Sequence, residues 1–231
     1  MDTASHVAGP RIRVLLVDDH AMVRRGMRDF LELHPDIEVV GEAVDGRDAI
    51  ERATELRPDI VVMDLMMPVV DGIESTARLK AALPEVEVIA ITSFIEEDRV
   101  VAAIEAGASG FLLKDAEADE LAGAIRSAAA GEVHLDPAIA GIVARRMRLG
   151  GRASGSADGG PGDGVATLTA RERDVLARVA RGLPNRRIAE DLGITERTAR
   201  THVSNILAKL GLASRTQAAL LAVQHGLDRE T

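Results

Sequence analysis

The chain has no cysteine among its 231 residues, although 46% of them are hydrophobic and can build a core. Without cysteine there is no disulfide scaffold and no zinc site with cysteine ligands, a composition typical of a reducing cytoplasm. Residues 1–13 lack the apolar core of a secretory signal, and no run of about 18 apolar residues could cross a membrane. We therefore expect a cytoplasmic, globular protein without membrane contact.

Two further patterns of secondary structure or ligand binding are absent from the sequence. No glycine-rich loop follows the first predicted strand, which argues against nucleotide or flavin binding. No strand pattern occurs after residue 167, and the chain has no internal repeat. The two ends of the chain are therefore expected to differ in secondary structure.

The net charge of −9 is unevenly distributed. Residues 168–231 contain 11 Lys+Arg and 7 Asp+Glu, a net charge of +4, whereas the rest contains 17 basic and 30 acidic residues, a net charge of −13. This asymmetry indicates two domains with different partners, and an anion would suit the basic one. Ordinary variation in surface charge would explain the same counts equally well.

Glycine is concentrated in residues 149–167, LGGRASGSADGGPGDGVAT, where no aromatic residue occurs. Such a stretch cannot build a core, so it predicts a flexible linker between domains. A helical pattern at 136–147 leads into it. The predicted parts are a flexible N-terminus (1–10), a first domain (11–133), a helical segment with the linker (134–167) and a second domain (168–231).

Strand and helix patterns alternate five times before the linker. This alternation predicts an α/β fold, a (βα)5 doubly wound parallel sheet with helices on both faces. The strands are predicted at 13–17, 37–43, 59–64, 87–92 and 110–114, and the helices at 21–33, 47–56, 72–83, 96–107 and 118–131.

Four helical patterns follow the linker and predict a small all-α domain. Thr169 and Glu172 have the spacing of a capping box, which predicts that the first helix begins at residue 170. The other helices are predicted at 186–192, 196–210 and 214–225, with Thr195 as the N-cap of the third helix.

Three carboxylates lie at predicted strand ends. Asp18 and Asp19 follow the first strand, and Asp64 ends the third. In the strand order 2-1-3-4-5 these two strands are neighbours, so their carboxyl ends bring the acids together. Three acids repel one another unless a hard cation lies among them, and Mg²⁺ suits such oxygen ligands. Asp19 could alternatively serve only to cap the helix that begins near His20.

Two more polar residues end strands at the same edge, Thr92 on the fourth and Lys114 on the fifth. A hydroxyl can hydrogen-bond a phosphoryl oxygen and an ammonium can neutralise its charge, so the edge favours phosphoryl chemistry. Asp64 is best placed to accept the phosphoryl group as an acyl phosphate, because it ends the central strand. Taken alone, Lys114 could equally be a solvated strand end.

The predicted helix 196–210 has an apolar back and a small, polar, cationic front. This combination suits the major groove of DNA, although a solvated arginine face on a helical hairpin would have the same pattern. The residues expected to reach base edges or phosphates are Arg197, Arg200, Thr201, Ser204 and Asn205, and those expected to contact the DNA backbone are Arg186, Arg187 and Lys209.

The first domain closely resembles the receiver domain of two-component response regulators, in the words LLVDDH, VVMDLMMPVVDG, AITSF and GASGFLLKD. The resemblance implies that a sensor histidine kinase phosphorylates Asp64. It also implies that Phe111 is the aromatic switch residue, where many relatives carry tyrosine. Asp115 replaces a proline that often forms a cis bond in this family. The implied Mg²⁺ ligands are Asp18, Asp19, Asp64 and the backbone carbonyl of Met66, and the implied phosphoryl contacts are Thr92 and Lys114.

The second domain resembles the LuxR-type helix-turn-helix of the NarL/FixJ family almost from end to end. Ala199 stands where valine is usual, and His202 matches the histidine of the motif. The resemblance implies that the fourth helix pairs two such domains as a dimer, but its apolar residues could equally pack against their own domain.

Together these features predict a phosphorylation-controlled DNA-binding transcription regulator that is not an enzyme and forms a homodimer when phosphorylated. A regulator that only keeps the receiver's shape is the alternative, although all the acids and the lysine are present. A phosphatase that works through an aspartyl phosphate is disfavoured, because it needs a second acid where Met66 stands. The first domain argues against a sigma-like factor.

Overall fold

The computed structural model describes residues 11–68, 70–132, 134–135, 139, 141–142, 145 and 165–227. Helical backbone occurs at positions 139, 141, 142 and 145, within the helix predicted at 136–147. The remainder of that helix, the predicted flexible N-terminus and most of the predicted linker lie outside the described residues.

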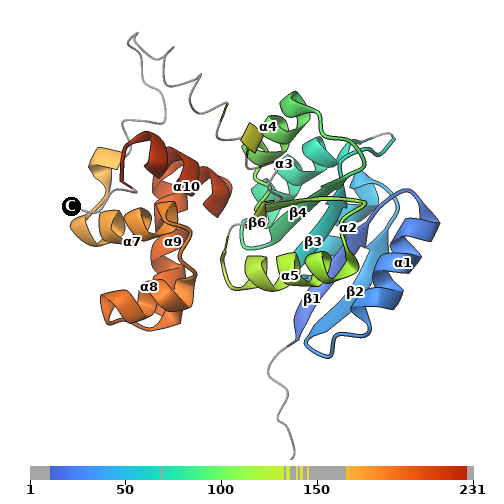
Figure 1. Ribbon diagram of the computed structural model, residues 1–231, viewed down its shortest axis with the longest axis horizontal. Coiled ribbons are helices and arrows are strands. Elements are labelled where there is room, and N and C mark those ends of the chain that lie inside the picture. The colour runs from blue at the N-terminus through green and yellow to red at the C-terminus, as the bar shows by residue number, and fades with distance from the viewer. Residues whose placement is uncertain are drawn as a thin grey trace, which may run out of the picture.

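A parallel sheet forms the centre of the first domain (Figure 1). Its strand order, β2-β1-β3-β4-β5-β6, confirms the predicted order 2-1-3-4-5 and adds one short strand at the edge. β6 pairs with β5 through only two residues, too few for a strand pattern in the sequence. The strands are β1 (Ile12–Val17), β2 (Ile37–Ala43), β3 (Ile60–Asp64), β4 (Glu87–Thr92), β5 (Gly110–Leu113) and β6 (His134–Leu135).

Helices cover both faces of this sheet, as the alternating pattern predicts (Figure 1). Successive residues of a strand point to opposite faces, so Val14 packs in the cluster with α5 while Leu15 packs in the cluster with α2 and α3. A third cluster lies between the sheet and α4 and contains Phe111. The helices are α1 (Ala21–Leu31), α2 (Gly46–Leu56), α3 (Gly72–Ala82), α4 (Glu97–Glu105) and α5 (Ala118–Ala129).

The second domain is the predicted four-helix unit with a core of its own. Thr169 and Glu172 form the predicted capping box, and the Thr195 hydroxyl caps the third helix by accepting from the Thr198 amide at 3.2 Å. Ala199 is fully buried on the apolar back of that helix. The helices are α7 (Ala170–Ala180), α8 (Asn185–Leu192), α9 (Glu196–Leu210) and α10 (Arg215–Gln224).

Within the described part of the chain, no single helix is long and apolar enough to cross a membrane. By length and composition alone, α9 and α10 pass that test only as a pair, and they are bent by 70° relative to each other.

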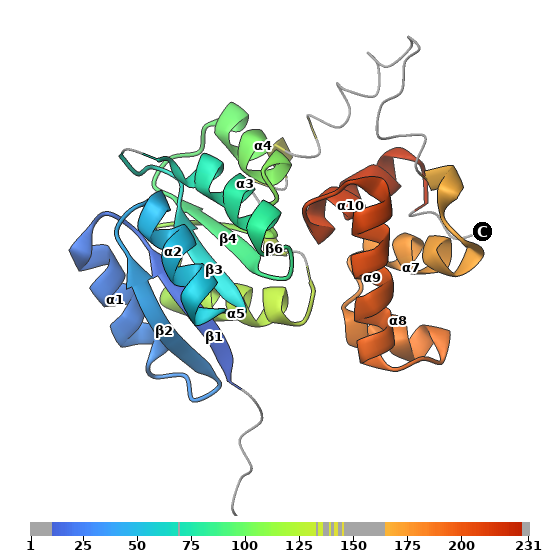
Figure 2. The same cartoon turned by 180° about the vertical axis from the view of Figure 1, so that it is seen from behind.

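The two domains contact each other through the start of α10, which lies nearest the sheet domain in both ribbon views (Figures 1 and 2). The Thr216 hydroxyl donates to the Ser109 carbonyl at 2.9 Å. The Gln217 side-chain amide donates to the carbonyls of Ile104 (2.9 Å) and Glu105 (2.8 Å), at the C-terminal end of α4. The side chain of Leu220 also packs in the cluster beneath α4. The sequence predicted two roles for this helix, and docking on the first domain was not among them.

Candidate functional site

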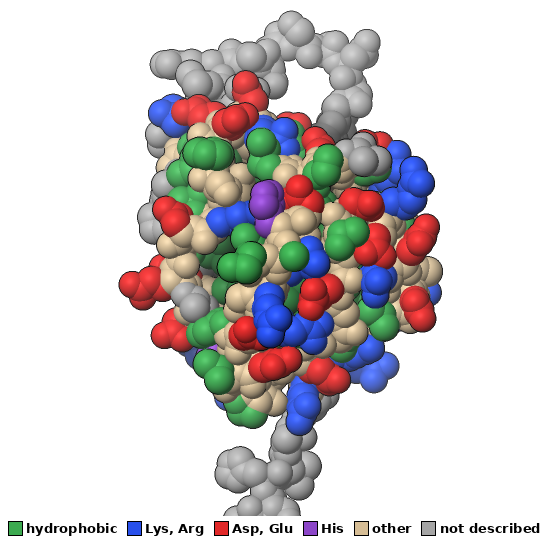
Figure 3. Space-filling view, turned by 90° about the vertical axis from the view of Figure 1, so that its right-hand side faces the viewer, with side chains coloured by type: hydrophobic (Ala, Val, Ile, Leu, Met, Phe, Trp, Pro, Cys, Tyr) green, Lys and Arg blue, Asp and Glu red, His purple; other side chains and the backbone are tan. Residues whose placement is uncertain are grey.

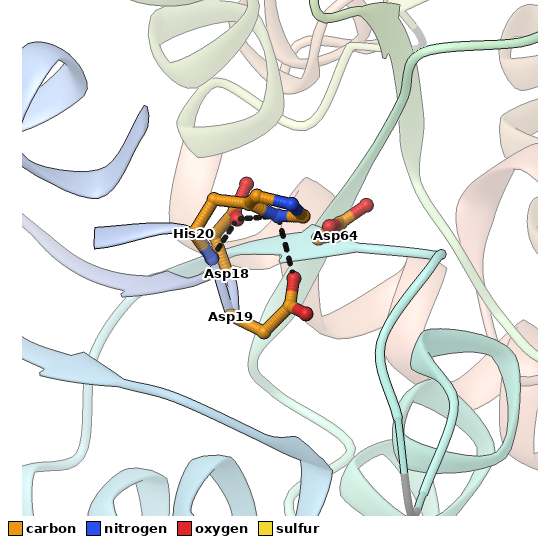
Figure 4. A group of neighbouring side chains, drawn as sticks. All are labelled: Asp18, Asp19, His20 and Asp64. Atoms are coloured by element: carbon orange, nitrogen blue, oxygen red, sulfur yellow. Dashed lines mark hydrogen bonds and ion pairs between the residues drawn. The ribbon is translucent and has the colours of Figure 1, made fainter. Parts of the chain in front are cut away.

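An acid cluster lies at the carboxyl ends of β1 and β3, as the strand order requires. Asp18 and Asp64 are fully buried, and Asp19 lies beside them with a partly exposed side chain. Lys114 reaches the cluster from the end of β5, and its Nζ lies 2.7 Å from Oδ2 of both Asp18 and Asp64. Figure 4 shows the three carboxylates together with His20.

The charge on Lys114 is set by its neighbours. Burial alone would lower the pKa of this amine, but the hydrogen bonds that it donates to Asp18 and Asp64, together with their negative charge, outweigh burial and raise the pKa above its ordinary value. Lys114 is therefore a fixed cation between two buried carboxylates, which would otherwise repel each other.

The donor atoms of the cluster fit a hard divalent cation. Asp18, Asp19, His20 and Asp64 each offer one ligand atom, and these four atoms lie within 4.8 Å of one another. Asp19 Oδ1 and Asp18 Oδ2 are buried, and their close polar contacts are His20 Nδ1 at 2.8 Å and Lys114 Nζ at 2.7 Å. Carboxylate oxygens gathered in this way are the type of ligand that Mg²⁺ prefers.

The sequence prediction of a metal site did not include His20. Its Nδ1 lies 2.8 Å from Asp19 Oδ1, but 67% of its side chain is exposed and Mg²⁺ prefers oxygen ligands. Asp19 is not the N-cap of α1: His20 holds that position, and its side chain makes no capping hydrogen bond. The capping alternative for Asp19 is therefore wrong.

The loop after Asp64 brings a backbone amide to its carboxylate. The Met66 N–H donates to Asp64 Oδ1 at 3.0 Å. Gly72 begins α3 so close to this loop that a Cβ there would lie 2.0 Å from the Asp64 carbonyl oxygen, so only glycine fits. Asp71 caps α3 by accepting from the Glu74 amide at 2.8 Å.

Thr92 lies at the predicted strand end, but its hydroxyl is engaged elsewhere. It donates to the Phe94 carbonyl at 3.2 Å and accepts from the Phe94 amide at 3.4 Å. Phe111 is fully buried between the sheet and α4. The Lys114–Asp115 peptide bond is trans, like every peptide bond within the described ranges.

The predicted DNA-contacting residues of α8 and α9 are all exposed. Several are engaged in local pairs: Arg186 and Arg187 with Glu190, and Arg200 with Glu196 at 3.7 Å. Lys209 is held more firmly, 2.7 Å from the buried carboxylate of Glu172. Its predicted contact with a DNA phosphate would have to compete with this ion pair. The exposed set is Arg186, Arg187, Arg197, Arg200, Thr201, Ser204, Asn205 and Lys209.

The front of α9 faces the first domain across a cavity of about 220 Å³. Arg200 and Ser204 line it from α9, and Asp59, Glu85 and Glu87 line it from the end of the sheet opposite the acid cluster. Two predicted DNA-contacting residues therefore face carboxylates of the same chain.

Arg215 is a buried cation at this junction, and no pattern in the sequence predicts its burial. Only 4% of the residue is exposed, and its guanidinium donates to Asn185 Oδ1 at 2.9 Å and to the Leu183 carbonyl. Burial lowers the pKa of Arg215 to about 10, although the negative charges of Glu87 and Glu132 act to raise it. Both glutamates belong to the first domain, so their field favours docking of the second domain.

The face of the sheet domain that carries α1 and β2 differs in its charge distribution from the exposed front of α9 (Figure 3). Acidic and basic side chains are interspersed there, with small groups of hydrophobic side chains between them. A surface with mixed signs of charge lacks the continuous positive field that attracts nucleic acid.

A buried acid cluster bridged by lysine on a (βα)5 sheet, joined to a helix-turn-helix domain, defines the class of response regulators. Two family models match accordingly. The response regulator receiver domain matches residues 14–126, and the luxR family of bacterial regulatory proteins matches residues 166–222. The chain belongs to the LuxR-type (NarL/FixJ) response regulators, which are phosphorylation-controlled transcription regulators.

Relatives and solved structures support this assignment along nearly the whole chain. The transcriptional regulatory protein LiaR of Bacillus subtilis is 46% identical over 94% of this chain and 99% of its own length. The response regulator protein VraR of Staphylococcus aureus is 43% identical over 94% and 98%. The crystal structure of ChrA, a response regulator of a heme-sensing two-component system, is 37% identical over 95% of this chain and 100% of its own, with a TM-score of 0.51.

Proposed function

We propose that Asp64 is the phosphoacceptor through which a sensor histidine kinase controls DNA binding. The observation that carries this proposal is the setting of its carboxylate. Asp64 is fully buried, yet it lies at the sheet edge with Lys114 Nζ and the Met66 amide on its two oxygens. A buried carboxylate with two positioned donors is suited to nucleophilic attack on a phosphoryl group.

In the proposed transfer, one oxygen of Asp64 attacks phosphorus and forms a new O–P bond. The bond between phosphorus and the phosphoryl donor breaks, and its electron pair stays with the donor. Lys114 neutralises charge on the phosphoryl oxygens, and the Thr92 hydroxyl turns from Phe94 to donate to one of them. Mg²⁺, held by Asp18, Asp19, Asp64 and the Met66 carbonyl, would supply further positive charge.

The second domain supplies the output. We assign base and phosphate contacts with double-stranded DNA to the exposed front of α9 and to Arg186 and Arg187. With Arg200 and Ser204 facing the carboxylates of the first domain, full access to the groove requires the domains to separate. Rotation of Thr92 would let Phe111 and α4 shift, which loosens the contacts of α10. Freed domains then pair as a homodimer on two half-sites, in the cytoplasm where kinase and DNA are both available.

The decisive experiment compares wild type with Asp64→Asn. Both proteins are incubated with acetyl phosphate and Mg²⁺, and intact mass and DNA affinity are measured. We expect wild type to gain one phosphoryl group and bind DNA more tightly, whereas Asp64→Asn does neither. Asp98→Asn is the matched control, because it removes an exposed acid near the same edge and should behave like wild type. Equal labelling of wild type and Asp64→Asn, or no labelling of either, would contradict the proposal.

A further inference from the structure

Arg99, in the first turn of α4, contacts the phosphoacceptor loop. Its Nη2 donates to the Leu65 carbonyl oxygen at 2.7 Å and lies 3.8 Å from Asp71 Oδ2. Only 29% of the side chain is exposed, and its Nε is buried without a hydrogen-bond partner. Placing a guanidinium here costs desolvation free energy. An ordinary solvated surface arginine would avoid that cost, so this position indicates a specific role.

The Leu65 carbonyl belongs to the same peptide unit as the Met66 amide. That amide donates to Asp64 Oδ1 at 3.0 Å, so Arg99 and the phosphoacceptor are joined through the two ends of one planar group. A charged donor on the carbonyl fixes the orientation of the plane. It also polarises the peptide, which strengthens the opposite N–H as a donor.

The described residues of the loop provide no equivalent charged contact to this peptide. The Gly72 amide lies 3.4 Å from the Leu65 carbonyl, a long and uncharged contact. Leu65 itself is buried in the same core cluster as Val100, Ala103 and Ile104 of α4, so its side chain packs with the helix that also holds its carbonyl. The first turn of α4 therefore determines where the Met66 amide points.

We propose that Arg99 is a positioning residue for phosphoryl transfer, which acts through the Leu65–Met66 peptide to aim the Met66 N–H at the reacting carboxylate. The proposal rests on Asp64 being the phosphoacceptor. As negative charge leaves the Asp64 carboxylate and builds on the phosphoryl oxygens beside it and then on the leaving acetate, an N–H already fixed at this point can donate to those oxygens without reorganisation. Substitution should therefore slow the transfer step more than it weakens binding of the phosphoryl donor or of Mg²⁺.

The test follows labelling of the full chain by acetyl phosphate with Mg²⁺ in wild type, Arg99→Gln, Arg99→Lys and Arg78→Gln. Arg78 is the matched control, because it is an exposed arginine on α3 whose partner, Glu74, lies on the same helix. We expect the maximal rate to fall about tenfold in Arg99→Gln, with half-saturating acetyl phosphate and Mg²⁺ changed less than about twofold. Arg99→Lys, which keeps the charge, should recover most of the rate, and Arg78→Gln should match wild type.

A second measurement does not depend on activity. The ¹H and ¹⁵N shifts of the Met66 amide, recorded without Mg²⁺ or phosphoryl donor, should change in Arg99→Gln and stay near the wild-type values in Arg99→Lys and Arg78→Gln. If Arg99→Gln does not fold, Arg99→His takes its place. The Met66 amide shifts and the maximal labelling rate are then compared between Arg99→His and Arg99→Lys. An unchanged maximal rate or an unmoved Met66 amide would overturn the role of Arg99. Absence of label on Asp64 in wild type would instead overturn the phosphoacceptor assignment itself.

Discussion

Lys114 stabilises the acid cluster, and the proposed function gives the same residue a role in phosphoryl transfer. Its amine contacts Oδ2 of Asp18 and of Asp64 at 2.7 Å, and these carboxylates raise its pKa despite burial. In the proposed transfer, the same ammonium that offsets repulsion between the carboxylates would also neutralise the phosphoryl group. The proposed chemical role and the structural role would then fall on one side chain.

Replacement of Lys114 should separate these two roles. Lys114→Met leaves two buried carboxylates without their counter-charge, so we expect the free energy of unfolding to fall by about 3 kcal/mol in EDTA. Mg²⁺ should restore part of this loss by binding the folded acids, while labelling by acetyl phosphate stays weak. Urea unfolding with and without Mg²⁺ measures the effect, and Arg25→Met, which removes an exposed cation of α1, is the control. Equal stability of Lys114→Met and wild type in EDTA would contradict this role.

An ion pair joins helices α7 and α9, and its acidic partner is also part of a helix cap. Glu172 completes the capping box of α7 and also accepts from Lys209 near the end of α9. Hydrogen bonds from Lys209 and from the backbone of Thr169 lower the pKa of Glu172 to about 2 from an ordinary value of 4.5. A local sequence motif thus fixes a contact between helices that lie far apart in the chain.

The lowered pKa gives this contact a defined pH dependence. A carboxyl with a lower pKa in the folded state contributes stability that is complete above about pH 4.5 and is lost as the pH falls through about 2. We expect Glu172→Gln to lower the melting temperature of the second domain at neutral pH, and the difference from wild type to disappear near pH 2. Thermal unfolding followed by NMR signals of the second domain measures this. Glu190→Gln, which removes an exposed surface pair, should have a much smaller effect. A difference that persists unchanged at low pH would exclude the charge as its cause.

At the scale of the whole molecule, α4 lies between the proposed phosphoacceptor and the output domain. Arg99 in its first turn holds the loop after Asp64, and the carbonyls of Ile104 and Glu105 at its other end accept from Gln217 of α10. A shift of α4 would therefore change contacts at both ends. The contacts of Gln217 join the same two domains that enclose the cavity lined by Arg200.

Loss of the Gln217 contacts should favour separated domains before phosphorylation. Gln217→Ala removes two hydrogen bonds across the interface, so we expect the DNA affinity of the unphosphorylated protein to rise about 5- to 30-fold. The affinity of the phosphorylated protein should change little, because under the proposed function phosphorylation has already released its domains. Fluorescence anisotropy on a duplex selected by wild type measures both states, with Gln224→Ala, an exposed glutamine at the other end of α10, as the control. A rise of equal size in both phosphorylation states would show that Gln217 acts on DNA binding directly.

The sequence by itself determined the secondary structure, the strand order and the gathering of acids at one sheet edge. These features depend on short windows: alternating apolar residues, the capping box at Thr169 and Glu172, and polar residues directly after strands. Parallel strands then bring Asp18, Asp64 and Lys114 to one edge without any knowledge of side-chain conformation. The two-residue β6 was missed because it is too short to show a pattern.

Only the tertiary structure decided how side chains distant in sequence meet. The contact of Arg99 with Leu65 spans 34 residues, and the contact of Gln217 with Glu105 spans 112. Arg215 looks in the sequence like any arginine at a helix start, yet it is buried at the domain junction. Such contacts depend on how whole helices pack and on which rotamers that packing allows, and no local pattern of residues records either.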